Sequence, residues 1–144
     1  MVRPPDDLQH GWSSVLLKGH ENRLGDAGAA PLMSDAIAWG GLVFLSGRAA
    51  VDPATGAVRA TTFAEQLQIV LDDTVMVLDQ AGSGLDAVLR VECWLTDRRH
   101  FPEWNAAYAR TFADPRPART TLVVAGLPVE GLLVEIQLTA AVRA

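Results

Sequence analysis

The residues best suited to chemistry in this 144-residue chain are two charges inside segments that otherwise have the composition of β-strands. Arg119 begins such a segment directly after a proline-rich loop, and Glu135 lies between Val134 and Ile136. Burying either charge without a partner would cost several kcal/mol. The pattern leaves two interpretations equally open. One is a salt bridge between neighbouring strands, and the other is a small site in which Arg119 binds an anion and Glu135 orients a water.

Other familiar catalytic patterns are missing from the sequence. It has no glycine-rich phosphate loop and no Gly-x-Ser-x-Gly motif, and His10, His20 and His100 are too widely spaced to propose a metal site. The residues alone therefore predict neither a metal site nor a phosphate-binding loop. The one cysteine, Cys93, lies in an alternating stretch, which favours a buried structural thiol over a nucleophile.

The composition indicates an ordinary globular domain and excludes several classes of function. Apolar residues make up 49% of the chain and charged residues 20%, and the net charge is -5. The negative balance argues against a nucleic-acid partner, and no apolar run reaches the ~18 residues of a membrane span. Without a secretory signal or a second cysteine, the expected location is the cytoplasm.

Periodicity predicts two helices and at least five strands. Residues 1–30 are punctuated by proline and glycine and form an N-terminal extension, with one short candidate strand at 15–17, and residues 31–144 form the domain. Strands are predicted at residues 36–39 and 42–45 around a Gly-Gly turn, and at 88–95, 119–124 and 132–140. Helices are predicted at 61–80, with a Thr62–Glu65 capping box and a terminal Gly82, and at 100–112.

The order β-β-α-β-α-β-β places the chain in the α+β class, with one mixed β-sheet and two helices packed on one face. The opposite face of that sheet still carries apolar residues. We therefore expect neighbouring subunits to cover it in a homo-oligomer.

An ordered set of short motifs resembles the Rid (YjgF-type) family. The C-terminal signature of that family matches Pro117-Ala118-Arg119-Thr120-Thr121, then Leu127-Pro128, then Val134-Glu135-Ile136. Further pieces follow the family order: Leu45-Ser46-Gly47, Asp52-Pro53 with Thr55-Gly56, Ala81-Gly82, Thr96-Asp97, and Phe101 with Asn105 and Tyr108. The resemblance covers about residues 31–143.

This resemblance implies a chorismate-mutase-like fold assembled as a homotrimer, with sites in the clefts between subunits. It also implies hydrolysis of enamine or imine intermediates such as 2-aminoacrylate to 2-keto acids and ammonia, without a cofactor. By the same resemblance, Arg119 binds the carboxylate of the small-molecule substrate and Glu135 positions the attacking water. The backbone N–H groups of Gly47 and Thr121 help to hold the substrate, and Asn105 supports the site.

The chain departs from the family pattern near the expected site. Met33 stands where archetypal members have a tyrosine, and Arg48 stands where they have a glutamine. If Arg48 points into the cleft, it would bind a second carboxylate of the substrate. Otherwise it is a solvated or a structural side chain. Two alternatives to the deaminase follow. One is a related hydrolase for a different pathway intermediate, for example a dicarboxylate, and the other is a non-catalytic trimeric protein that binds small ligands.

Overall fold

The computed structural model describes residues 11–20 and 32–144. Seven strands form one mixed sheet in the order β1-β2-β3-β7-β5-β6, with β4 also paired to β7. Among the strand pairs of these described residues, β5 and β6 run parallel and the others run antiparallel. The strands are β1 (Ser13–Val15), β2 (Ala36–Trp39), β3 (Leu42–Leu45), β4 (Arg48–Ala49), β5 (Val88–Leu95), β6 (Ala118–Val123) and β7 (Val134–Ala141).

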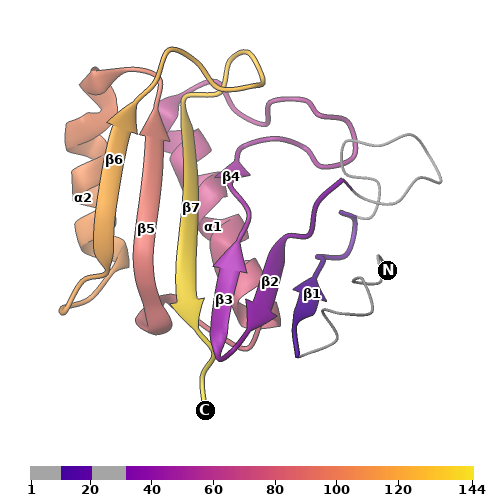
Figure 1. The fold of residues 1–144 in the computed structure, drawn as a ribbon. Coiled ribbons are helices and arrows are strands. Elements are labelled where there is room, and N and C mark those ends of the chain that lie inside the picture. Colours follow the sequence, from indigo (N-terminus) through magenta and orange to yellow (C-terminus); the bar gives the residue numbers. More distant parts are fainter. Residues whose placement is uncertain (1–10, 21–31) are drawn as a thin grey trace.

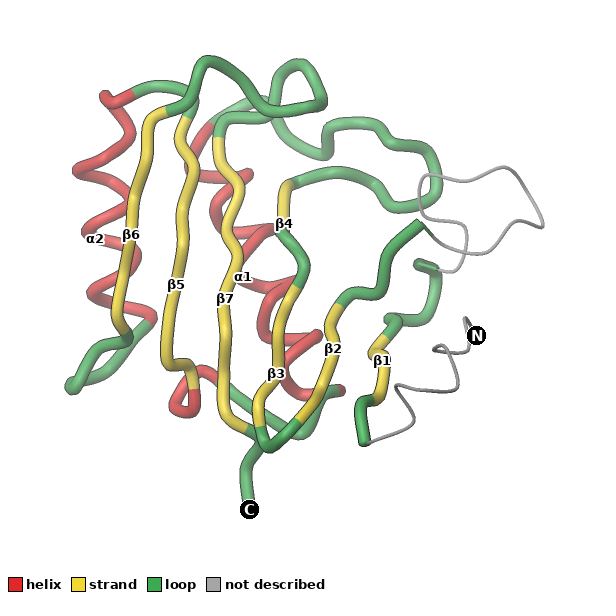
Figure 2. The backbone as a smooth tube through the Cα atoms, viewed as in Figure 1, coloured by secondary structure: helices red, strands yellow, loops and turns green. Residues whose placement is uncertain are grey.

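Two helices, α1 (Phe63–Gln80) and α2 (Phe101–Thr111), lie on the same face of this sheet (Figure 1). Short 3-10 turns precede β5 (Leu85–Ala87) and α2 (Arg98–His100). In the tube view, no helix of the described residues covers the other sheet face (Figure 2). The expected α+β class and the helices on a single face are confirmed.

Helix α1 begins and ends where its capping residues predict. The Thr62 hydroxyl accepts a hydrogen bond from the Glu65 N–H at 3.3 Å and donates to the Glu65 carboxylate at 2.6 Å. Gly82 follows the helix with a φ of 72°, a conformation that glycine adopts without strain. The buried stripe along α1 includes Leu67, Val70 and Leu78, at the spacing of an amphipathic helix.

The hydrophobic core fills the space between the helices and the sheet. Alternate residues of β5 and β7 face it, so that Val91, Leu95, Val134 and Ile136 are fully buried. The residues between them face the uncovered side of the sheet. Large apolar side chains remain exposed on that side, including Trp39 on β2, Phe44 on β3 and Leu122 on β6.

Most predicted elements differ from the structure by one or two residues at an end. Among the strands, the largest differences are in the first strand, the last strand and β4. The first strand spans Ser13–Val15 where residues 15–17 are predicted. The last strand begins at Val134, two residues late, because the Leu133 N–H donates to the buried Gln66 side chain at 2.8 Å instead of joining the sheet ladder. The two-residue strand β4 is missing from the prediction, since two residues are too few to show alternation.

Candidate functional site

Arg119 lies on the edge strand β6, on the side of the sheet that faces α2. Its register partner Val91 is buried against the helices, and so the Arg119 side chain extends over α2. The guanidinium donates to Asn105 Oδ1 at 2.7 Å and lies over the Tyr108 ring, 4.8 Å from its centroid. Among the residues that the structure describes, Arg119 has no carboxylate partner. An exposed cation held in this way keeps N–H donors for an anion.

Thr121 is held beside this arginine on the same strand. It faces α2 as Arg119 does, and its hydroxyl accepts a hydrogen bond from the Trp104 indole N–H at 3.0 Å. The Tyr108 hydroxyl donates to the Pro117 carbonyl at 2.8 Å, which fixes the start of β6. Burial raises the pKa of Tyr108 against the opposing effect of the nearby Arg119 charge, so the phenol stays neutral at pH 7.

Gly47 and Glu135 form a second group, on the uncovered face of the sheet. Glu135 pairs in register with Ala49 on one side and Trp94 on the other, and it is half-buried. Its carboxylate lies so close to Gly47 that a Cβ added there would fall 3.1 Å from the Glu135 Cδ and closer still to Oε1. Only a residue without a side chain leaves this carboxylate where it is.

A pocket of about 600 Å³ opens at this second group. Its lining is largely apolar and includes Gly47, Glu135 and, among others, Met33, Ile37, Phe44, Val129 and Leu132. Asp52 also lines it, and hydrogen bonds from the Thr55 and Ala54 N–H groups hold the pKa of Asp52 below its usual value. The Asp52 carboxylate is therefore ionised at neutral pH.

The two groups do not meet within the chain. Strand β5 lies between β6 and β7, and Arg119 and Glu135 lie on opposite faces of the sheet. A salt bridge between neighbouring strands, one of the two interpretations of the sequence, is therefore wrong. The predicted residues fall into two sets: Arg119, Asn105 and Thr121 at the β6 edge, and Gly47, Glu135 and Met33 around the pocket.

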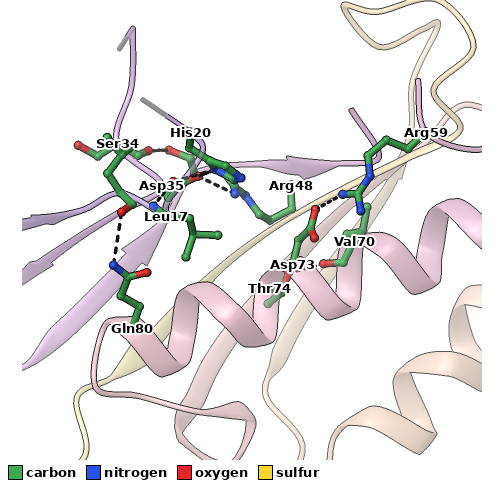
Figure 3. Close-up of polar contacts among 12 residues, drawn as sticks. Leu17, His20, Ser34, Asp35, Arg48, Arg59, Val70, Asp73, Thr74 and Gln80 are labelled. Carbon is green, nitrogen blue, oxygen red and sulfur yellow. Dashed lines mark hydrogen bonds and ion pairs between the residues drawn. The ribbon is translucent and has the colours of Figure 1, made fainter. Parts of the chain in front are cut away.

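Arg48 belongs to neither set. The expectation that its side chain binds the substrate is wrong. It pairs in register with the buried Ile136 and is 2% exposed, on the helix-covered side of the sheet. Its Nη1 donates to Asp35 Oδ1 at 2.7 Å, and Figure 3 shows it beside Asp35 and His20 above α1. A side chain held there reaches neither the pocket nor solvent. The sequence carried no signal for Asp35, its partner, beyond a charge directly before a strand.

Cys93 is buried, as the alternating pattern predicts. Burial raises the pKa of its thiol to about 12, although the Arg119 charge acts in the opposite direction. Such a thiol carries almost no thiolate at neutral pH and is a poor nucleophile.

The described ranges contain neither a cluster of side chains able to hold a metal ion nor a helix able to span a membrane. Within residues 11–20 and 32–144, no three His, Cys, Asp or Glu side chains gather as metal ligands would. Neither helix in those ranges is long and apolar enough to cross a bilayer.

The fold and this signature define a known class of protein. The family model described as endoribonuclease L-PSP matches residues 25–142. Protein HMF1 of Saccharomyces cerevisiae is 36% identical over 115 residues, covering 80% of this chain and 88% of that protein. A RutC family protein of Pyrococcus horikoshii is 34% identical over 104 residues, covering 72% and 82% of the two chains.

Solved structures agree with this match. A Rid family protein from Yersinia pestis superimposes with a TM-score of 0.76 at 30% identity, covering 92% of this chain and all of that one. An endoribonuclease L-PSP homologue from Entamoeba histolytica gives a TM-score of 0.74 at 32% identity, with 91% and 99% coverage. The chain therefore belongs to the endoribonuclease L-PSP family, also called the Rid or YjgF family.

Proposed function

We propose that this protein is a cofactor-independent deaminase that hydrolyses enamine or imine intermediates to 2-keto acids and ammonia. We further propose that it acts as a homotrimer, with each site built from the β6 edge of one subunit and the pocket of its neighbour. The observation that carries the proposal is the Arg119 guanidinium, which is exposed, anchored by Asn105 and without a carboxylate partner among the described residues.

The division of the site into two groups supports an intersubunit arrangement. Arg119 supplies the cation that binds the substrate carboxylate, and the pocket supplies Glu135 and the backbone at Gly47. Within one chain, Arg119 and Glu135 lie on opposite faces of the sheet. The uncovered face carries exposed Trp39, Phe44 and Leu122, which a neighbouring subunit would bury. In a closed ring every β6 edge then meets a pocket.

The proposed chemistry requires the protein only to bind and orient the substrate and to position one water. An enamine such as 2-aminoacrylate tautomerises to the imine: its methylene carbon gains a proton and its nitrogen loses one. Water then adds to the imine carbon, and the resulting carbinolamine loses ammonia to leave the 2-keto acid. Arg119 would hold the carboxylate through two parallel N–H donors, and the Gly47 and Thr121 N–H groups would fix its orientation. Glu135 would orient the water and take its proton.

The pocket supports a substrate with one carboxylate. Arg48, the residue that suggested a dicarboxylate, is bonded to Asp35 on the other side of the sheet. The described lining of the pocket contains no Lys or Arg, and it contains the carboxylates of Asp52 and Glu135. A second negative group on the substrate would meet repulsion there.

The test is ammonia release from imines generated in solution by an amino-acid oxidase, compared for the unaltered protein, Arg119→Ala and the exposed control Arg98→Ala. We expect Arg119→Ala to lower kcat/KM by roughly 100-fold, since a charge-assisted bidentate contact is lost, and Arg98→Ala to leave it unchanged. No ammonia release above the oxidase background would overturn the proposal. If the unaltered protein released no ammonia but bound pyruvate, and Arg119→Ala abolished that binding, the protein would be a non-catalytic binder of small ligands.

A further inference from the structure

The proposed site leaves one buried charge cluster without a role. Asp35 is fully buried and Arg48 is 2% exposed, and they share the hydrogen bond of 2.7 Å between Arg48 Nη1 and Asp35 Oδ1. His20 Nδ1 lies 2.9 Å from the same carboxylate oxygen. The cluster lies above α1 (Figure 3). By the register of β4 and β7, Arg48 is on the sheet face opposite Glu135 and the pocket.

Stability alone is a poor explanation for this cluster. Taking both charges out of water costs free energy that their attraction repays only when every donor is satisfied. The Nε and Nη2 groups of Arg48 are buried and have no hydrogen-bond partner within residues 11–20 and 32–144. Apolar side chains of similar volume would serve packing at least as well, so the pair is better explained by the positions it fixes.

On one side, the cluster holds the residues that flank Gly47. The Ser46 N–H donates to the Asp35 carbonyl at 3.0 Å, and the Ser46 hydroxyl donates to the Ser34 carbonyl at 2.7 Å. Arg48, the next residue after Gly47, is held by the Asp35 side chain. Gly47 thus lies between two residues that are both tied to positions 34 and 35.

On the other side, the same carboxylate holds the N-terminal segment. The Leu17 N–H donates to Asp35 Oδ2 at 2.9 Å, and the Asp35 N–H donates to the Val15 carbonyl at 2.9 Å. The His20 ring, with Nδ1 2.9 Å from Asp35 Oδ1, adds a further contact between this segment and the carboxylate. One carboxylate therefore joins residues 15–20 to the turn at residues 46–48.

We infer that Asp35 and Arg48 are positioning residues that couple the N-terminal segment 15–20 to the Gly47 backbone of the proposed site. Because the functional consequence rests on the role proposed for Gly47, the inference has two separate readouts. Loosening the segment at residues 15–20 loosens the turn at 46–48, and the loosened turn binds the substrate carboxylate less tightly.

The first readout is amide hydrogen exchange in His20→Ala and Arg48→Gln. The matched control is Arg59→Gln, which breaks an ion pair with Asp73 of similar length, 2.8 Å, outside the site. We expect both test variants to speed exchange at residues 15–18 and 46–49 together by about tenfold or more, with β5 unchanged. His20→Ala keeps the buried ion pair, so it serves if Arg48→Gln fails to fold. Exchange that rises at 15–18 but not at 46–49 in His20→Ala would overturn the coupling.

The second readout is the kinetic constants of the same variants. A positioning role predicts a KM for the imine raised roughly tenfold with kcat nearly unchanged, whereas simple unfolding would lower kcat with the folded fraction and leave KM alone. Equal KM values in His20→Ala, Arg48→Gln and the unaltered protein would refute the link to binding. If the unaltered protein proves inactive, the proposed function fails by itself, and the exchange experiment still decides the coupling.

Discussion

The carboxylate of Glu135 occupies the space that a side chain at position 47 would need. An added Cβ on Gly47 would lie 3.1 Å from Glu135 Cδ and 3.4 Å from its Cγ. The obstructing group is the flexible end of a side chain, so a larger residue at position 47 would displace the carboxylate and leave the sheet in place. A small side chain at position 47 is therefore expected to disturb the chemistry at Glu135 without disturbing the stability of the sheet.

Gly47→Ala should therefore lower activity far more than stability. We expect kcat to fall by at least about tenfold because Glu135 turns away from the water it orients. The free energy of unfolding should change by less than about 1 kcal/mol, as for substitutions without core strain. Gly126→Ala is the matched control, since a Cβ there meets open space. Full activity in Gly47→Ala would contradict the role given to Glu135, and urea unfolding would show whether stability had changed instead.

Gln66 should be a stability residue that sequence patterns do not reveal. Its side chain donates to the Ala60 and Gly131 carbonyls, both at 2.9 Å, and accepts from the Leu133 N–H at 2.8 Å. Gln66→Leu leaves three backbone groups without these bonds and should cost about 3 kcal/mol in urea unfolding. Gln68→Leu, on the exposed face of the same helix, should change stability by no more than ~0.5 kcal/mol. Equal effects of the two changes would refute this account of Gln66.

The Cys93 thiol should be inert in the folded protein. With a pKa raised to about 12 by burial, it carries only a trace of thiolate at pH 8. Titration with a thiol-specific disulfide reagent at pH 8 should detect no reactive thiol in the native protein and one after denaturation in urea. Rapid reaction of the native protein would show that the thiol is exposed and reopen a nucleophilic role.

Asp35 should contribute to stability above pH 4 and lose that contribution in acid. Burial would raise the pKa of Asp35, but the Leu17 N–H, His20 and the Arg48 charge together lower it below the ordinary value of 3.8. A lowered pKa means that the stabilisation is complete above about pH 4 and disappears as pH falls through the folded-state pKa. Asp35→Asn should therefore be less stable than the unaltered protein at pH 7, and the difference should shrink below pH 4. A constant difference across this range would contradict the account.

The sequence predicted those elements whose pattern repeats over many residues. Helix α1 was placed within two residues because its apolar stripe and its Thr62 cap agree. The alternation in β7 correctly separated Glu135 from its buried neighbours Val134 and Ile136. The hairpin at residues 36–45 followed from two short apolar runs around Gly40-Gly41.

What the sequence left open depends on strand order and on single contacts. Alternation gives the two faces of a strand, but it does not show that β5 separates β6 from β7, which rules out the Arg119–Glu135 bridge. The side on which Arg48 lies is set by a two-residue strand, too short to show a pattern. Its partner Asp35 is adjacent only in space, through the pairing of β1, β2 and β3.

The most direct test of the central claim is complementation between two inactive variants. Arg119→Ala and Glu135→Gln should each lose activity alone, because each removes one half of every site. When the two are unfolded together in equal amounts and refolded, random trimers contain intact sites at about a quarter of their interfaces, and about a quarter of the original activity should return. No recovery in refolded mixed oligomers would place both residues in one subunit's site and contradict the intersubunit arrangement.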